Sequence, residues 1–357
     1  MRVAVAGLGL IGGSIALACR ERAGAAVAGF DSDPAVRDTA ATMGAVDAVH
    51  ASLEEAVAGA DVAFVAVPVG ALEDAVARTI AATGEDCVVT DVGSTKRAVA
   101  DAFDDARFVG GHPLAGAETA GIGNARADLF DGATWYLTPN AGSTTGVLYE
   151  RLHRLLAQLG ARPVAIDAAE HDRLMAVVSH LPHVLANVLV AQAADELTGG
   201  DGALVAAGPS LRDATRVAGA NSAIWGDIYV ANADAITAAL TRFQAALQNA
   251  AELLGAHDRD AVVAWNEDAR EDRERLLGTD LLGGATKELR VAVPNRPGVV
   301  AEIALALGRA AVNIVDLALA PSPDNSQGVV RLWLLGEDQA RVAAELIGDL
   351  GFPVASA

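Results

Sequence analysis

The chain opens with an alternation of short apolar runs and helical stretches. The run around Val3 and Val5 is typical of a buried strand, and residues 10–22 are good helix formers. Further strand-like runs follow, with helical stretches between most of them, at 25–30, 62–67, 87–92, 108–110, 134–137 and 163–166. Alternating strands and helices predict an α/β domain with a doubly wound parallel Rossmann sheet, whose ligands bind at the carboxyl ends of the strands.

The pattern changes twice after residue 166. From Ala168 to about Leu277 apolar residues recur at helical spacing with few strand signals, which predicts an all-helical domain. A charged stretch at 266–275 reads as a linker, and beyond it the pattern is that of a βαββαβ, ferredoxin-like unit. Its expected elements are strands 287–293, 312–319 and 327–335, helices 299–309 and 337–350, and a last short strand. We therefore expect three domains, at 1–167, 168–280 and 286–357.

Charge and composition narrow the possible partners. The 357 residues include 46 acidic and 26 basic side chains, a net charge of -20, and only two lysines, Lys96 and Lys287. Binding to nucleic acid depends on clustered basic side chains, so we expect no nucleic-acid partner. We also expect no membrane partner, because no segment offers the roughly 20 uninterrupted apolar residues that span a bilayer. Cys19 and Cys87 fit neither a metal site nor a disulfide framework, which favours the cytoplasm.

The glycines after the first strand indicate a dinucleotide site. Gly7, Gly9 and Gly12 match G-x-G-x-x-G, and Asp31 stands 19 positions after Gly12, where a carboxylate can accept hydrogen bonds from a ribose. The helix N-terminus offers free N–H groups to a pyrophosphate. A carboxylate at this position repels a 2′-phosphate, so NAD is favoured over NADP. The expected cofactor contacts are Gly7, Gly9, Leu10, Ile11, Gly12, Asp31, Val67, Pro68 and Ser94.

Two residues near later strand ends are candidates for catalysis. His112 follows an expected strand end and precedes Pro113, so we expect its ring to project from a loop. A neutral imidazole suits a general base that deprotonates a hydroxyl while its carbon loses a hydride. The alternative is a loop histidine bonded to backbone. Ser94 either orients that ring or the hydroxyl, or caps a helix that starts at Thr95.

The helical domain adds two further groups. His180 and His183 lie at i and i+3, on one helical face, but neither a cysteine nor a suitably spaced carboxylate completes a ligand set, so we expect no metal. Asp213 and Arg216 are also three residues apart. They form either an ordinary surface ion pair or a pair in which Asp213 positions Arg216 to bind a substrate carboxylate.

In this order the motifs resemble the prephenate dehydrogenase family. The resemblance spans residues 1 to about 277 and is carried by segments 7–14, 91–96, 112–118, 179–183 and 212–216, followed by Trp225 and Asp227. It implies a homodimer, formed through the helical domain, that uses NAD to convert prephenate to 4-hydroxyphenylpyruvate by oxidative decarboxylation in tyrosine biosynthesis. Gly226 departs from the family pattern, in which a larger, often basic residue is expected.

The resemblance also implies a role for each site residue. His112 deprotonates the ring hydroxyl and Ser94 orients it. His183 and Arg216 hold substrate oxygens, and Asp213 positions Arg216. The remaining substrate-site residues are Glu118 and Trp225 at the mouth of the pocket, and His180 as the structural partner in the histidine pair.

The last 70 or so residues resemble an ACT domain, an amino-acid-sensing module. The features that carry this resemblance are the turn at 294–298 and Asn313 after the first helix. It implies allosteric feedback control by tyrosine or another aromatic amino acid, bound near Asn295, Arg296, Gly298 and Asn313. The alternative is a module that only dimerises.

Three other functions compete with this interpretation. An arogenate dehydrogenase would bind an ammonium in place of the side-chain carbonyl, and the sequence leaves this possibility open. A β-hydroxyacid dehydrogenase of the 6-phosphogluconate type relies on a lysine in the helical domain, and residues 168–277 contain none. A non-catalytic sensor of NAD and amino acids is expected to carry a helix-turn-helix or a basic face, and neither is evident.

Overall fold

The computed structural model describes residues 1–116, 120–139, 146–197, 208–278, 286–294, 296, 298–310, 312, 314–321 and 327–356. The chain divides into two compact units, Met1–Asn249 and Ala250–Ala357. The division falls inside helix α11 (Ala233–Gly255), so the Rossmann part and most of the helical part lie within one unit.

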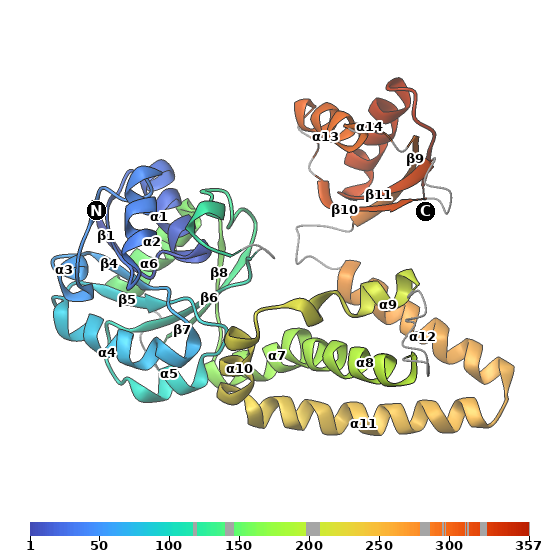
Figure 1. The fold of residues 1–357 in the computed structure, drawn as a ribbon, viewed down its shortest axis with the longest axis horizontal. Coiled ribbons are helices and arrows are strands. Elements are labelled where there is room, and N and C mark those ends of the chain that lie inside the picture. The colour runs from blue at the N-terminus through green and yellow to red at the C-terminus, as the bar shows by residue number, and fades with distance from the viewer. Residues whose placement is uncertain are drawn as a thin grey trace. The chain divides into compact units, whose positions relative to one another are not determined.

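The first unit is built on a five-stranded parallel sheet in the order β3-β2-β1-β4-β5. Alternate side chains of β1 enter two separate cores, with Val3 and Val5 in one and Ala4 and Ala6 in the other, because successive strand residues face opposite sides. Helices therefore cover both faces, as the doubly wound prediction requires (Figure 1). The strands are β1 (Arg2–Ala6), β2 (Ala26–Phe30), β3 (Ala48–Val49), β4 (Val62–Val65) and β5 (Val88–Asp91). The helices of this region are α1 (Leu10–Ala23), α2 (Pro34–Thr42), α3 (Leu53–Val57), α4 (Leu72–Ala82), α5 (Arg97–Ala102) and α6 (Val147–Gln158).

Three later strands form a second sheet in the order β6-β7-β8, which a single bridge from Val89 to Phe108 links to β5. They are β6 (Val109–Pro113), β7 (Thr134–Pro139) and β8 (Arg162–Ala165). The expectation of parallel strands throughout is wrong here, because β6 and β7 are antiparallel. The described part of the connection between them contains only a short 3₁₀ turn, Ile122–Asn124, whereas a parallel crossover needs a long segment that is usually a helix.

The rest of the first unit is helical, as predicted. It comprises α7 (Ala168–Met175), a π-helical turn (Ala176–His180), α8 (Leu181–Leu197), α9 (Pro209–Ala214), a 3₁₀ turn η5 (Arg216–Gly219), α10 (Ser222–Ala231) and α11. The continuous run Ala168–Glu196 is long and apolar enough to cross a membrane, although core helices of water-soluble proteins pass the same test and one such helix is weak evidence. This run exposes several apolar side chains: Val177, Val178, Val188, Leu189 and Val190.

The second unit ends in a four-stranded antiparallel sheet in the order β10-β11-β9-β12. The elements follow the predicted order, as β9 (Thr286–Pro294), α13 (Val299–Arg309), β10 (Ile314–Pro321), β11 (Gln327–Leu335), α14 (Gly336–Asp349) and β12 (Val354–Ser356). Its core joins Leu289 and Val291 of β9 to Ile303 and Ile347 of the two helices. The stretch at 266–275 is not a linker but part of helix α12 (Arg259–Gly278), in which Arg270 pairs with Glu267 and Glu274 on neighbouring turns.

Candidate active site

The glycine turn after β1 leaves the N-terminus of α1 open. Gly7 has a φ of 92°, and a Cβ on Gly12 would collide with the Gly7 carbonyl, so both positions require glycine. A Cβ on Gly9 would meet nothing within 4 Å, and no side chain caps the helix that starts at Leu10. These free N–H groups fit a pyrophosphate.

Asp31 stands just after β2 and is held by backbone amides. Its Oδ2 accepts a hydrogen bond from the N–H of Leu8 at 2.8 Å, and its Oδ1 accepts one from Asp33 at 3.0 Å. Each carboxylate oxygen keeps a lone pair for a ribose hydroxyl. Sequence reasoning missed Arg37, which donates to the Asp31 carbonyl at 2.6 Å and so helps to fix this turn. The residues present therefore fit NAD.

A cavity of 290 Å³ lies between the second sheet and the helical part of the same unit. It brings together four residues predicted for the site, which are Ser94, His112, His180 and Trp225. The other lining residues are Pro113, Leu114, Ala115, Met175, Val178, Ser179 and Ile228. Ser179 and His180 belong to the π-helical turn, an irregularity that often marks functional sites.

His112 lies in a strand, not in a loop. Strand β6 runs on to Pro113, because His112 pairs with Tyr136 and Pro113 with Trp135 of β7, and His112 is only 9% exposed. Its Nδ1 is 2.8 Å from Nε2 of His171, and Nδ1 of His171 is 2.8 Å from Oδ1 of Asp172. Neither His171 nor Asp172 was predicted as a site residue.

The surroundings of His112 keep its ring neutral. Burial lowers the pKa of His112 well below its usual 6.5, and electrostatic interactions with His171, Lys96 and His180 lower it further. A neutral imidazole can accept a proton at physiological pH, as a general base must.

A buried ion pair fixes the backbone that carries Ser94 and His112. Lys96 and Asp91 are both fully buried and pair with each other. Asp91 also accepts hydrogen bonds from the N–H groups of Gly93 at 2.8 Å and Gly111 at 3.0 Å, one residue before Ser94 and His112 respectively. Burial lowers the pKa of Lys96, and the nearby Asp91 carboxylate opposes that shift.

Ser94 does not cap the helix that follows. Helix α5 starts at Arg97, not at Thr95, and its first N–H groups donate to Asp172 instead, from Lys96 at 2.7 Å and from Arg97 at 2.9 Å. The capping role considered for Ser94 is therefore wrong. Ser94 is one of the residues that line the cavity.

The two histidines of the helical part have different surroundings. Nδ1 of His180 lies 3.1 Å from the amide nitrogen of Asn232, and burial lowers the pKa of His180 to about 4. His183 does not line the cavity. It stacks on Trp225 with ring centroids 3.5 Å apart, and its Nδ1 is 2.7 Å from the Tyr229 hydroxyl.

The remaining predicted substrate and effector residues that the structure describes do not line this cavity. Helix α9 ends at Ala214 and η5 begins at Arg216, so Asp213 and Arg216 lie on different elements, and both side chains are exposed. Glu118, Asn295 and Asn313 lie outside the described residues. In the second unit, Arg296 pairs with Glu302 at 2.6 Å, and Gly298 has a φ of 86° just before α13.

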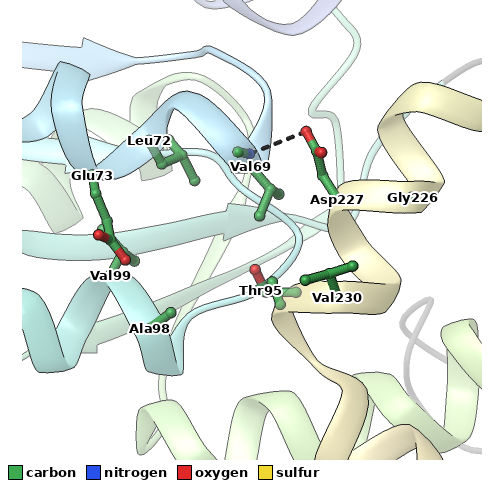
Figure 2. A pocket seen from close by; sticks show the side chains of 11 residues that line it. Val69, Leu72, Glu73, Thr95, Ala98, Val99, Gly226, Asp227 and Val230 are labelled. Carbon is green, nitrogen blue, oxygen red and sulfur yellow. Dashed lines mark hydrogen bonds between the residues drawn. The ribbon is translucent and has the colours of Figure 1, made fainter.

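A second cavity, of 510 Å³, separates α10 from the turns after β4 and β5 (Figure 2). Asp227 of α10 accepts a hydrogen bond from the N–H of Gly70 at 3.1 Å, which fastens the helix that carries Trp225 to the Rossmann part. A Cβ on Gly226 would meet nothing within 4 Å. The space that a larger residue would enter is therefore open in this chain.

Comparisons with known proteins agree with this arrangement. Residues 15–165 match the family described as prephenate dehydrogenase, nucleotide-binding domain, and residues 167–267 match prephenate dehydrogenase, dimerization domain. The chain is 31% identical to the prephenate dehydrogenase of Bacillus subtilis, over 97% of this chain and 95% of that protein. It is also 31% identical to the cyclohexadienyl dehydrogenase of Zymomonas mobilis, over 77% of this chain and 95% of that protein.

Two solved structures are similar to about three quarters of this chain. The prephenate dehydrogenase of A. aeolicus in complex with hydroxyphenyl propionate and NAD+ matches with a TM-score of 0.72 and 27% identity, over 77% of this chain and 98% of that one. The arogenate dehydrogenase of Synechocystis matches with a TM-score of 0.67 and 26% identity, over 77% and 100% of the two chains.

Proposed function

Because the chain belongs to the prephenate dehydrogenase family and is an NAD-dependent oxidoreductase, we propose that it converts prephenate to 4-hydroxyphenylpyruvate by oxidative decarboxylation. The observation that carries this proposal is the cavity that joins neutral His112 and Ser94 in one wall. Ser94 follows β5, and His112 lies near the carboxyl end of β6, close to the edge where such folds bind ligands.

The residues divide the chemistry among them. NAD, when bound, supplies the acceptor for the hydride that leaves the ring carbon bearing the hydroxyl. His112 takes the hydroxyl proton on Nε2, because its Nδ1 is already bonded to His171. Ser94 orients the hydroxyl. The bond to the ring carboxylate then breaks, and its electron pair makes the ring aromatic as carbon dioxide leaves.

The helical part supplies the other contacts. His180 presents Nε2–H to a substrate oxygen, since its Nδ1 accepts a hydrogen bond from Asn232. Trp225 forms the opposite wall, and its ring stacks with that of His183. We keep the roles predicted for His183 and Arg216 in holding substrate oxygens, for Asp213 in positioning Arg216, and for Glu118 at the mouth of the pocket.

The described lining of the cavity supports prephenate over arogenate as the substrate. Among the described residues that line it, none carries a carboxylate that could pair with the ammonium of arogenate. An ammonium without a partner is costly to bury. We expect kcat/KM for prephenate to exceed that for arogenate by about 10-fold or more, measured as NAD reduction at several concentrations of each substrate. Equal values, or a preference for arogenate, would identify the chain as an arogenate or a broad cyclohexadienyl dehydrogenase.

We propose a homodimer as the working assembly. The helical part matches the family's dimerization domain, and α8 exposes Val188, Leu189 and Val190. Burying these side chains against a second copy removes apolar surface from water. The cytoplasm remains the expected compartment, and both cysteines are buried free thiols.

We further propose that the second unit carries an ACT domain that senses an aromatic amino acid. Its βαββαβ order and the left-handed Gly298 before α13 support this assignment. An aromatic effector such as tyrosine is then expected to lower the rate of the full chain by about 5-fold or more, and deletion of residues 286–357 to abolish that effect.

The deletion variant also separates regulation through the ACT domain from inhibition by an amino acid that binds at the active site. If the truncated chain is inhibited as strongly as the full chain, the amino acid binds at the active site and not at the ACT domain. If no aromatic amino acid changes the rate of the full chain, the second unit does not sense one, and the alternative of a module that only dimerises is favoured.

A further inference from the structure

A second histidine lies directly behind the proposed base. His171 is fully buried and lies between His112 and Asp172. Its Nε2 is 2.8 Å from Nδ1 of His112, and its Nδ1 is 2.8 Å from Oδ1 of Asp172. Asp172 is 3% exposed, and its two carboxylate oxygens accept the N–H groups of Lys96 and Arg97. The three side chains thus form a continuous row that leads from the cavity wall into the protein.

The hydrogen bonds fix the tautomer of each ring. Burial alone would raise the pKa of Asp172, but hydrogen bonds from His171 and from the amides of Arg97 and Lys96 outweigh it, so the group is a carboxylate that only accepts. His171 must therefore donate from Nδ1, and in the arrangement that leaves His112 able to act as a base its Nε2 is the acceptor. His112 in turn donates from Nδ1. Its Nε2 lone pair is then free to accept a proton from a ligand in the cavity.

On the premise of the proposed function, we infer that His171 and Asp172 form a proton-holding relay with His112. As the hydride leaves the substrate carbon, the substrate O–H bond breaks and an N–H bond forms at Nε2 of His112. The Nδ1 proton of His112 shifts to Nε2 of His171, and the Nδ1 proton of His171 shifts toward Asp172. The positive charge is thereby spread to a site beside a carboxylate.

The same relay returns the proton at the end of the reaction. When the bond to the ring carboxylate breaks, the electron pair makes the ring aromatic and leaves a negative charge on the ring oxygen. That oxygen takes a proton back from Nε2 of His112, and the two shifts reverse. The overall reaction therefore releases no proton from the hydroxyl, so the relay has no need of a route to solvent. Its inner end, a carboxylate fixed by two backbone amides, is suited to stabilising the positive charge on His171 rather than to passing a proton onward.

Other ionisable groups also face the relay. Lys96, paired with Asp91, and His180 of the π-helical turn act on His112 through their charges. Tyr136 of β7 contacts the edge of the His171 ring at a centroid distance of 5.6 Å. His171 and Asp172 are positioning residues in this account, because they act on the substrate only through His112.

Substitution of His171 by glutamine tests the relay. A glutamine amide can donate to Asp172 and accept from His112, but it cannot carry a proton onward. We expect His171→Gln to lower kcat on prephenate by roughly 10–100-fold, with KM and NAD affinity close to wild type. We also expect the acidic limb of the kcat profile to move to lower pH, because a protonated His112 loses the charge sharing that favours it.

The matched control is His153→Gln, on α6 outside the cavity. This variant should leave kcat on prephenate and the acidic limb of the kcat profile unchanged. A variant His171→Gln with kcat within about twofold of wild type, or with an acidic limb that does not move, overturns the relay. A wild-type protein that does not oxidise prephenate at all contradicts the proposed function instead.

Nitrogen-15 NMR of histidine-labelled wild-type protein tests the tautomers without any substrate. We expect the His112 signals, identified by their loss in His112→Asn, to report a protonated Nδ1 and an unprotonated Nε2 at neutral pH. A protonated Nε2 in the resting protein would reverse the direction of the hydrogen bonds and overturn the inference, even if His171→Gln fails to fold.

Discussion

Replacing His112 by asparagine is expected to lower the turnover of prephenate by roughly 10²–10⁴-fold, the usual range for removal of a general base. An asparagine in β6 can still donate a hydrogen bond toward Nε2 of His171, which keeps the local structure, but its amide does not accept a proton at physiological pH. The affinity for NAD should change little, because the expected NAD contacts lie at the glycine turn and at Asp31.

Two measurements together separate loss of chemistry from loss of structure. Steady-state rates with prephenate give the loss of turnover, and titration with NAD gives the affinity of the cofactor. His153→Asn is the matched control and should retain wild-type rates. Unaltered turnover in His112→Asn would rule out His112 as the base, whereas a parallel loss of NAD affinity would point to a folding defect.

Replacing Lys96 by methionine is expected to lower the free energy of unfolding by about 3–5 kcal/mol, the usual cost of removing one partner of a buried ion pair. The change leaves the carboxylate of Asp91 fully buried, with the N–H groups of Gly93 and Gly111 as its remaining hydrogen-bond donors among the described residues. These two amides precede Ser94 and His112, so the same substitution should also loosen the active site.

The only other lysine of the chain provides the control. Lys287 pairs with Glu337 at 2.9 Å, but the two side chains are 48% and 83% exposed. Lys287→Met should therefore lower the free energy of unfolding by only about 0–1 kcal/mol. Urea unfolding of the full chain measures both effects. Equal costs for the two variants would mean that the burial of the Lys96 pair contributes nothing to stability.

Features that depend on local geometry could be predicted from the sequence. The turn at Gly7 and Gly12 follows from steric limits on neighbouring residues, and Asp31 follows from the length of one strand–helix–strand unit. The element order of the second unit was also predictable, because its strands and helices alternate apolar positions with the periods of 2 and 3.6 residues.

Features that depend on tertiary pairing were not predictable in the same way. Pro113 suggested a loop at His112, but pairing with β7 extends the strand through both residues. The contact between His112 and His171 joins residues 59 positions apart, which no local motif encodes. One signal was available for this contact: His171 and Asp172 share the buried face of α7 with Met175, and polar residues on an apolar helix face usually have a specific partner.

The most direct test of the proposed reaction is its stoichiometry with the wild-type chain. We predict that each mole of prephenate consumed yields one mole of NADH, one of carbon dioxide and one of 4-hydroxyphenylpyruvate. Measurement of all three in one reaction decides the matter. NADH without carbon dioxide, or no NADH from prephenate at all, would contradict oxidative decarboxylation as the activity of this chain.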